Sequence, residues 1–543
     1  MAAPPNHYRD GMGRLILTGH GEKLGDRHVP AGVARRWLLA ILALLAMAPA
    51  CQRHQPRAPA AETSADNGPH AVKAPSEEIW EAFYLQGAKI GYGHTTIHKV
   101  SREGRQLVET RSKNHLAITR FGQRTEQDVN MEILETPAGK VLEFKTQVAF
   151  GPSPTVVTGR AGDGQMALTT ETKGRRDTTR IGWSSDIRGF RAIEQSLAED
   201  PMKPGARRTF KMLMPLVNQI AEVELAARDY EMAPVLGVEA KLLRVDSVAR
   251  LRDGQSLSSI LWTNEQGEVI KTRIAALAQE SFRTTRALAL APARDEGKFD
   301  LGLDLIVRVD PPLKRAHETR QVRYRVELAD GDPLKTFATG PTQSVRSLGQ
   351  NAAEVTVRSL RPGDVKKPAE PPATVSSEYK SANSLLQIDD PRVQEMAREA
   401  KGAARDPRDV AIALERYVSR VVSEKNFSHA FATAAEVAES REGDCTEHAV
   451  LLAALARACG IPSRVAIGLV YVQRAGGFGY HMWTEVYLDG RWVPLDAIVA
   501  QGGTSAAYLK LADSSLHGAS AYSSFLAVAG VLGQLKIEVL EAE

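Results

Sequence analysis

Residues 441–497 constrain the fold more than any other part of this 543-residue chain. Cys445 opens the run 446–458, which is apolar almost all round, as is typical of a helix buried in a core. The thiol is therefore predicted at a helix N-terminus, where unpaired N–H groups and the positive dipole end favour the thiolate, the reactive form of a cysteine nucleophile. Gly460 and Pro462 are predicted to end this helix.

Two strand-like runs, 481–488 and 491–495, follow and are joined by Asp489-Gly490, a strong signal for a type I′ hairpin. A two-residue loop fixes the register, so counting back from the turn places Trp483 opposite Asp496 and puts His481 on the same face. His481 and Asp496 are then diagonal cross-strand neighbours, about 7–8 Å apart at the backbone. An imidazole with a carboxylate beside it is the arrangement of a catalytic base and the group that orients it.

These residues resemble the transglutaminase-like cysteine enzymes, a papain-like group that includes transglutaminases, bacterial proteases and peptide N-glycanases. The matching pieces are GDCTEHAVLLAALARACGIPSRV around Cys445 and HMWTEVYLDGRWVPLD, which holds His481 and Asp496. The resemblance covers residues 379–543 and implies an α+β, papain-like domain. It implies Cys445 as the nucleophile, His481 as the base and Asp496 as its orienter.

Two further residues share the strand face of His481. Trp483 would shield the bond between His481 and Asp496. Glu485 either shapes the site or is a solvated strand carboxylate, and the sequence leaves both interpretations open.

No metal or cofactor is predicted. Glu447 and His448 lie beside the nucleophile, but no HExxH or CxxC pattern accompanies them, so they are interpreted as helix-face residues that pack or line the cleft. The chain also lacks an acidic calcium loop of the EF-hand type. Cys459, placed in the middle of the same predicted helix, is interpreted as a small buried hydrophobe.

The composition is that of an ordinary globular protein, and the length predicts three or four domains. The net charge of +4 is small, and no basic block alternates with aromatic residues, so nucleic-acid binding is not expected. Three cysteines do not make a disulfide framework.

Residues 1–50 read as a secretory signal, with Arg35-Arg36 followed by a short apolar run and a small-residue cleavage site. The apolar run of about 14 residues is too short to span a bilayer. Cys51 follows directly and resembles the lipobox cysteine of bacterial lipoproteins, which is acylated and becomes the mature N-terminus. This predicts export to the cell envelope and a lipid anchor to a membrane, facing the periplasm, with plain secretion as the alternative.

The rest of the chain divides by composition. Residues 51–78 are rich in proline, alanine and charge and read as a flexible tether. Residues 79–298 alternate with a period of two and predict an antiparallel sheet, with hairpins around Gly87 and Gln266-Gly267 and the shape of a curved half-barrel. Such a sheet can serve as a scaffold, can present substrate, or can bind lipids or peptides.

Residues 299–360 predict a small β-domain of sandwich type, whose clearest strand-like runs are 303–309, 322–328 and 353–357. Residues 361–378 form a proline-rich linker. The catalytic domain, 379–543, starts with helices, and the alternation over 535–540 predicts a last strand.

Helix starts in this domain are marked by capping residues. Asp390 and Asp406 each precede a proline at the first helical position. Thr433 with Glu436 forms the pattern of a capping box. The fold expected overall is multidomain, with antiparallel β-rich domains before an α+β transglutaminase-like domain.

The resemblance implies a cysteine enzyme that attacks amide bonds of peptides or proteins through Cys445 and a thioester, and the predicted signal places it in the cell envelope. The backbone N–H of Cys445 is expected to donate to the oxyanion, and a second donor is not identified. Hydrolysis, by a peptidase or amidase, is favoured over transamidation. The alternative is a non-catalytic binding or scaffold protein that uses this fold and the β-domains as a platform. The substrate, the acyl acceptor and the oligomeric state stay open.

Overall fold

The computed structural model describes most of the chain after residue 74. The described residues are 75–120, 122–252, 254–274, 279–292, 300–329, 331–368, 373–424, 431–518 and 521–543. The predicted signal, Cys51 and the tether up to residue 74 lie outside them, and the first strand already begins at Glu77. No helix in this described part is both long and apolar enough to cross a membrane.

The N-terminal region forms one 15-stranded sheet, as the two-residue period predicts. Its order is β8-β7-β6-β5-β4-β3-β2-β1-β15-β14-β13-β12-β11-β10-β9, so that chain neighbours pair throughout except where β1 meets β15. The pairing of β9 with β10 is parallel and the rest is antiparallel. The strands are β1 Glu77–Leu85, β2 Ala88–Arg102, β3 Arg105–Arg120, β4 Gln123–Glu135, β5 Val141–Val148, β6 Thr155–Gly162, β7 Gln165–Thr172, β8 Arg175–Gly182, β9 Ile187–Arg188, β10 Arg207–Met214, β11 Gln219–Val235, β12 Val238–Leu251, β13 Ser256–Thr263, β14 Val269–Ile274 and β15 Gln279–Thr284.

Both hairpins expected in this sheet are present. Gln86 and Gly87 have φ of 48° and 82° between paired Leu85 and Ala88, the positive values that a tight two-residue turn requires. Thr263 and Val269 close the second hairpin, and Gly267 within its loop has φ of 77°. Two short helices accompany the sheet, α2 Ala192–Glu199 and α3 Arg286–Leu290.

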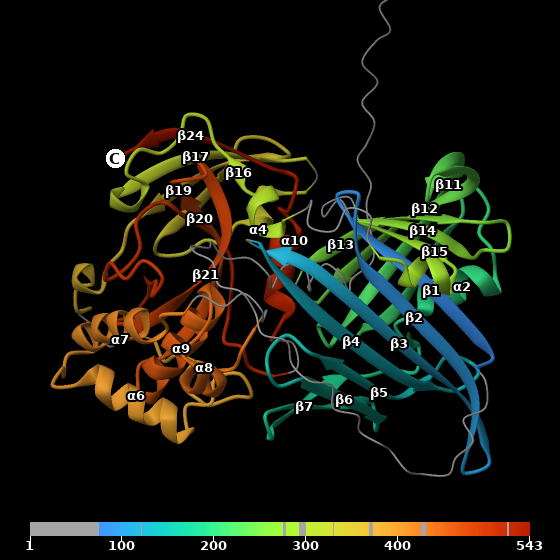
Figure 1. The fold of residues 1–543 in the computed structure, drawn as a ribbon, viewed down its shortest axis with the longest axis horizontal. Helices are drawn as coiled ribbons and strands as arrows, with labels where there is room; N and C mark the ends of the chain where they lie inside the picture. The colour runs from blue at the N-terminus through green and yellow to red at the C-terminus, as the bar shows by residue number, and fades with distance from the viewer. Residues whose placement is uncertain are drawn as a thin grey trace, which may run out of the picture. The chain divides into compact units, whose positions relative to one another are not determined.

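The C-terminal region is built on a five-stranded sheet with the helices around α9. Its order is β16-β21-β20-β23, and β22 also pairs with β21. The strands are β16 Val307–Arg308, β20 Ser463–Val472, β21 Gly477–Leu488, β22 Arg491–Leu495 and β23 Tyr508–Ser514. The helices are α6 Pro391–Lys401, α7 Pro407–Val421, α8 Ala434–Ser440 and α9 Cys445–Ala458 (Figure 1). Helix α9 packs on β20 and β21 and contacts all three other helices, so it is central to this region.

The predicted helix starts are confirmed. The Asp390 carboxylate accepts from the first N–H groups of α6, and the Asp406 carboxylate does the same for α7. Thr433 and Glu436 make the reciprocal capping box of α8. Side-chain oxygens therefore satisfy N–H groups that would otherwise be unpaired at each helix start.

A second sheet joins two segments that are far apart in the chain. Its order is β18-β19-β17-β24, with β18 Gln343–Ser347, β19 Ala352–Arg358, β17 Gln321–Leu328 and β24 Leu535–Ala542. The last predicted strand, β24, thus exists but pairs with β17 rather than with the sheet that carries His481. Conversely, β16 belongs to the segment 299–360 but pairs with β21 of the segment 379–543. Each of the segments 299–360 and 379–543 therefore contributes one strand to a sheet formed mainly by the other.

Two expectations for 299–360 need correction. This segment does not form a sandwich of its own: β17, β18 and β19 share a four-stranded sheet with β24, and β16 belongs to the sheet that carries His481. The strand expected at 303–309 is found only at the end of that run: α4 Leu301–Asp304 takes its first two residues, and β16 begins at Val307. Asp300 accepts from Gly302 N at 2.9 Å, and this local cap outweighs the strand pattern. The remaining short helices are η2 Ala316–Glu318, α5 Pro333–Thr336, η3 Pro362–Asp364, η4 Ser377–Tyr379, η5 Ser523–Phe525 and α10 Leu526–Ala529.

Candidate active site

Cys445 is the first residue of α9, and the sequence on both sides of it explains why the helix begins there. Asp444 accepts from Thr446 N at 2.8 Å, and Glu447 accepts from Asp444 N at 3.0 Å, which completes a capping box. Gly443 has φ of 148°, and a Cβ at this position would lie 2.3 Å from Glu447 Cβ. A glycine is therefore required for the cap to form, and the cap fixes the thiol at the positive end of the helix.

Glu447 and His448 have structural roles beside the nucleophile. Glu447 also accepts from Ala432 N at 2.9 Å, and burial, together with the neighbouring Asp444 carboxylate, raises its pKa. The His448 Nδ1–H donates to Asp444 O at 2.6 Å. Throughout the described part of the chain, no group of three histidine, cysteine, aspartate or glutamate residues could hold a metal ion.

The hairpin brings His481 and Asp496 together. Asp489 and Gly490 have φ of 47° and 86°, and the ladder runs from the pair Leu488–Arg491 back to the pair before Asp496, in the register that the turn predicts. His481 Nε2 lies 2.8 Å from Asp496 Oδ2, and both side chains are buried. An acidic oxygen at this distance holds the imidazole in one orientation and stabilises its protonated form.

Two further groups hold the Asp496 carboxylate. Tyr508 donates its hydroxyl to Oδ2 at 2.7 Å, and Ile498 N donates to Oδ1 at 2.9 Å. Burial alone would raise the pKa of Asp496, but the charge of His481 and the hydrogen bonds from His481, Tyr508 and Ile498 N lower it. Burial and the Asp496 charge both raise the pKa of Tyr508, which therefore stays a donor. Asp496 is kept as an anion facing His481.

Glu415 on α7 fixes the backbone around Asp496. Its carboxyl group accepts from Asp496 N at 2.9 Å, from Gly502 N at 2.6 Å and from Gly503 N at 3.3 Å. Burial raises the pKa of Glu415 to about 7 against these three hydrogen bonds, and the Asp496 charge adds to the rise. One buried side chain thus connects α7 to the loop that follows β22.

Glu415→Gln is expected to destabilise the protein by about 1–3 kcal/mol, because an amide NH₂ would face a backbone N–H donor. In the unaltered protein, Glu415 titrates near 7 when folded, against an ordinary value of 4.5. Its contribution to stability is therefore present below pH 4.5 and is lost as the pH rises to 7, by up to roughly 3 kcal/mol. Thermal unfolding at about pH 5 and about pH 8 measures both effects. Glu395→Gln, on the exposed face of α6, is the control and should change neither.

Aromatic rings surround the imidazole. The Trp483 ring stacks at 6.3 Å and 20° from His481 and meets Tyr508 edge-on at 5.4 Å. Trp483 is 3% exposed and packs with Ala466 and Val470 on the same side of the sheet. Trp483 thus packs beside the imidazole in a buried layer, and its role as a shield of the bond between His481 and Asp496 stays a prediction.

Tyr508→Phe is expected to lower turnover several-fold without loss of the fold, since it removes one hydrogen bond to a buried carboxylate, worth about 1.5–3 kcal/mol. The change should appear in the rate constant and in its pH profile more than in substrate affinity, because Tyr508 acts through Asp496. Tyr487→Phe removes a hydroxyl that donates to Ala373 O at 3.2 Å at the exposed end of β21, and it should be silent. Equal losses in the two variants would contradict a positioning role for Tyr508.

A second histidine lies near the pair and could not be found from the sequence. His317, in η2, has its ring 6.5 Å from the Tyr508 ring, and its buried Nδ1 has no hydrogen-bond partner in the described part of the chain. Burial lowers its pKa, although the Asp496 charge acts in the opposite direction. Tyr508 and Glu415 were missed for the same reason, because their segments are separated from the hairpin in the chain.

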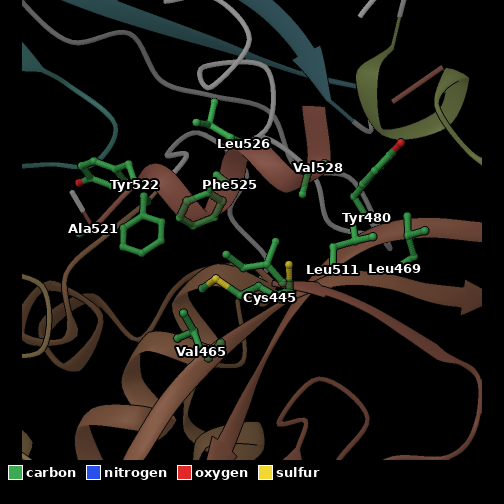
Figure 2. Close-up of a cluster of buried hydrophobic side chains, with 14 of the residues drawn as sticks. Cys445, Val465, Leu469, Tyr480, Leu511, Ala521, Tyr522, Phe525, Leu526 and Val528 are labelled. Carbon is green, nitrogen blue, oxygen red and sulfur yellow. The ribbon is translucent and has the colours of Figure 1, made fainter. Parts of the chain in front are cut away.

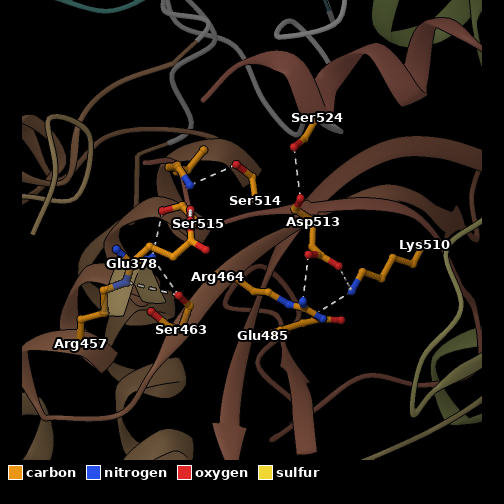
Figure 3. A network of polar contacts seen from close by, with 11 residues as sticks. Glu378, Arg457, Ser463, Arg464, Glu485, Lys510, Asp513, Ser514, Ser515 and Ser524 are labelled. Carbon is orange, nitrogen blue, oxygen red and sulfur yellow. Dashed lines mark hydrogen bonds and ion pairs between the residues drawn. The ribbon is translucent and has the colours of Figure 1, made fainter. Parts of the chain in front are cut away.

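Glu485 belongs to an ion-pair network rather than to the His481–Asp496 pair. It accepts from Arg464 and from Lys510, each at 2.7 Å, and Asp513 contacts both cations at 2.8 Å (Figure 3). Its side chain is 4% exposed, so the interpretation as a solvated carboxylate is wrong. The network connects β20, β21 and β23, which stabilises the sheet under the site.

Cys445 itself is enclosed. It is 1% exposed and lies in an apolar cluster with Val465, Leu469 and Tyr480 of the sheet and the η5 and α10 turns (Figure 2). Tyr480 precedes His481 in β21, and alternate residues of a strand point to opposite faces. The thiol and the imidazole therefore belong to opposite faces of the sheet.

The strand pairing along one edge of β21 is interrupted beside His481. On one edge of β21, β16 pairs as far as Phe478 and β22 pairs from Thr484 onward, so His481 falls in the interval. Among the described residues, His481 Nδ1 has no hydrogen-bond partner. Its bond to Cys445 is thus not formed here, and hydrogen bonds of this kind are often long before substrate binds.

Cys459 differs from Cys445 in its position in the helix and in the surroundings of its thiol. It is the C-cap of α9 instead of a mid-helix residue, since the helix ends at Ala458 and Gly460 follows with φ of 83°. Burial raises the pKa of its thiol, which lies 3.7 Å from Ala397 O. Neither cysteine forms a disulfide.

The family model for the transglutaminase-like superfamily matches residues 394–497. Among solved structures, a candidate cysteine protease from Cytophaga hutchinsonii is similar at 15% identity over 40% of this chain and 83% of that one, with a TM-score of 0.26. A candidate protease from Parabacteroides distasonis is similar at 11% identity over 64% of each chain, with a TM-score of 0.16. None of the curated proteins compared matches. The chain thus carries a transglutaminase-like domain of α helices and antiparallel strands, after a large β-rich N-terminal region.

Proposed function

We propose that this protein is a cysteine enzyme that cleaves or transfers amide bonds of peptides or proteins through Cys445, His481 and Asp496. The observation that carries the proposal is the buried bond of 2.8 Å between His481 Nε2 and Asp496 Oδ2. A solvated surface pair would have little catalytic meaning, whereas this pair is buried and next to the strand gap described above. The capped start of α9 supplies a thiol in a setting that favours the thiolate.

In this mechanism, the Cys445 thiol passes its proton to His481 Nδ1, and the thiolate attacks the amide carbonyl carbon. The C–N bond breaks, the protonated imidazole gives its proton to the leaving amine, and an acyl thioester remains on Cys445. His481 then takes a proton from water or from an incoming amine, whose oxygen or nitrogen attacks the thioester. The thiol leaves with that proton, and a carboxylic acid or a new amide is released.

Hydrolysis is the proposed outcome and transamidation the competitor. The test is mass spectrometry of cell-envelope peptides incubated with the unaltered protein and with Cys445→Ala. Hydrolysis of a main-chain amide gives two shorter peptides, hydrolysis of a side-chain amide gives a one-unit mass increase, and transamidation gives an amine adduct. Cys459→Ala is the matched control and should behave as the unaltered protein. Products that are equally abundant with Cys445→Ala would leave a binding or scaffold role as the better account.

The location proposed is the cell envelope, with a lipid on Cys51. Mature protein should begin at Cys51 and partition into detergent, and Cys51→Ser should lose this property. One acyl chain binds a membrane only marginally, whereas two or more hold stably, at about 0.8 kcal/mol per buried CH₂. Intact-mass measurement of the membrane fraction checks the modification, and Cys459→Ser is the control. Unchanged membrane retention in Cys51→Ser would count against the anchor.

A further inference from the structure

A cavity of about 420 Å³ lies within the N-terminal sheet, away from every residue of the candidate active site. Its walls come from β1, β2, β3 and β4 on one side and from β10, β13 and α2 on the other. Strands that are far apart in the sheet order therefore face the same space, which requires the sheet to curve back on itself. A volume in this range is that of a small-molecule site.

Most of the wall is apolar and buried. Ile79 and Phe83 of β1, Met131 of β4, Met214 of β10 and Leu261 of β13 line the cavity, and each is at most 8% exposed. Methionine side chains adapt to irregular ligands because they are unbranched and polarizable. A hydrocarbon chain entering this space would be removed from water, at about 0.8 kcal/mol for each buried CH₂.

Hydrogen-bond acceptors meet at one place on this wall. A Cβ built on Gly93 would lie 3.0 Å from Asn114 Oδ1 and 3.4 Å from Glu81 Oε2, and the Phe83 ring is 2.6 Å from the same point. Gly93 therefore leaves room for an amide oxygen and a carboxylate to converge beside an aromatic ring. Two acceptors close together favour a ligand group that donates hydrogen bonds.

The charged side chains that line the cavity also favour a ligand with a cationic head group. Five glutamates line the cavity against two arginines, and one of these, Arg283, already pairs with Glu268 at 3.4 Å and with Glu77 at 3.9 Å. An anionic head group would meet this excess of carboxylates and be repelled. A cationic head group would be attracted, more strongly in a partly enclosed site than in water.

We propose that this cavity binds a single-chain amphiphile with an amine head, which reaches the Glu81 and Asn114 oxygens while its hydrocarbon chain fills the apolar part. The site is independent of the proposed catalytic reaction, since no residue beyond Arg283 lines it. If the amidase test fails, the proposed binding site still stands. If the binding test fails, the proposed amidase activity still stands.

The test is calorimetric titration of the full chain with n-dodecylamine, dodecan-1-ol and dodecanoate, each below its micelle concentration. We expect the amine to bind about tenfold or more tightly than the carboxylate, which corresponds to about 1.4 kcal/mol. Glu81→Gln should lower the affinity for the amine by a similar factor and leave the alcohol unchanged. Glu78→Gln is the matched control, because Glu78 is on β1 but points to the other face of the sheet, and it should change nothing.

A second pair of variants tests the location of the chain. Met131→Trp should weaken binding of all three compounds by filling the cavity, whereas Asn130→Trp, its neighbour on β4 facing the other side, should not. If Met131→Trp does not fold, the comparison of Glu81→Gln with Glu78→Gln still tests the proposed site. Dodecanoate binding as tightly as the amine, or equal losses in Glu81→Gln and Glu78→Gln, would overturn the proposal. Binding of an apolar peptide, without binding of any of the three amphiphiles, would also overturn the proposal.

Discussion

His481→Ala is expected to abolish turnover and to shift the alkylation of Cys445 to higher pH. General acid–base catalysis by a positioned imidazole contributes roughly 10²–10⁴-fold, and the variant would lose it together with the partner that stabilises the thiolate. Alkylation of the unaltered protein is expected to remain fast near pH 6, whereas an unassisted thiol reacts mainly near or above about pH 8.5. The measurement is the rate of labelling by a small alkylating reagent as a function of pH.

The pH of half-maximal labelling is the quantity to compare, because Cys445 is 1% exposed and its absolute rate also depends on how often the enclosing cluster opens. Cys459 is the internal control, since burial raises its pKa and no histidine is paired with it in the mechanism. An unchanged pH profile for Cys445 in His481→Ala would show that the two residues are not paired. The proposed enzyme would then lose its main physical support.

Asp496→Asn is expected to have the second-largest effect, a loss of turnover of roughly 10²-fold or more with a smaller shift in Cys445 labelling. The amide can keep the imidazole near its position but cannot stabilise its positive charge. Its NH₂ would also face a donor in either orientation: His481 Nε2 and the Tyr508 hydroxyl at the position of Oδ2, or Ile498 N at the position of Oδ1. Steady-state turnover and the labelling profile should be measured on the same preparation.

The comparison of Asp496→Asn with Asp496→Ala separates orientation from charge. Asp496→Ala removes both, so it should approach His481→Ala in turnover and also in the labelling profile. Should Asp496→Asn retain the turnover of the unaltered protein, the carboxylate would have a structural role only. In that case the loss in Asp496→Ala would be traced to the Ile498 N–H and Tyr508 hydroxyl left without an acceptor.

Local sequence patterns predicted the parts of the site that depend on short-range rules. The two-residue turn at Asp489-Gly490 sets the register, and the register alone brings His481 to Asp496. The cap of α9 is likewise encoded within a few residues of Cys445. In the N-terminal region, the two-residue period predicted an antiparallel sheet, and turn residues predicted its hairpins.

The rest depends on contacts between distant segments, which no local pattern encodes. Glu415 reaches the Asp496 backbone from α7, and Tyr508 reaches its carboxylate from β23, so neither has a signal in its own neighbourhood. Periodicity also cannot assign a strand to a sheet, which is why the alternation over 535–540 predicted a strand but not its pairing with β17. The cavity requires the curvature of a whole sheet and is invisible to any window of sequence.

The pairing of β24 with β17 has a consequence for how the chain folds as it is made. Leu328 pairs with Leu535, so β17 must wait for a strand that leaves the ribosome far later. Until then, β17 presents an unpaired edge, the kind of surface that invites pairing with another nascent chain. β16 precedes β17 and pairs with β21, so the sheet that holds His481 also depends on pairing between distant segments. Pairing between such distant segments is slow, so the unpaired edge of β17 is where a chaperone is expected to act first.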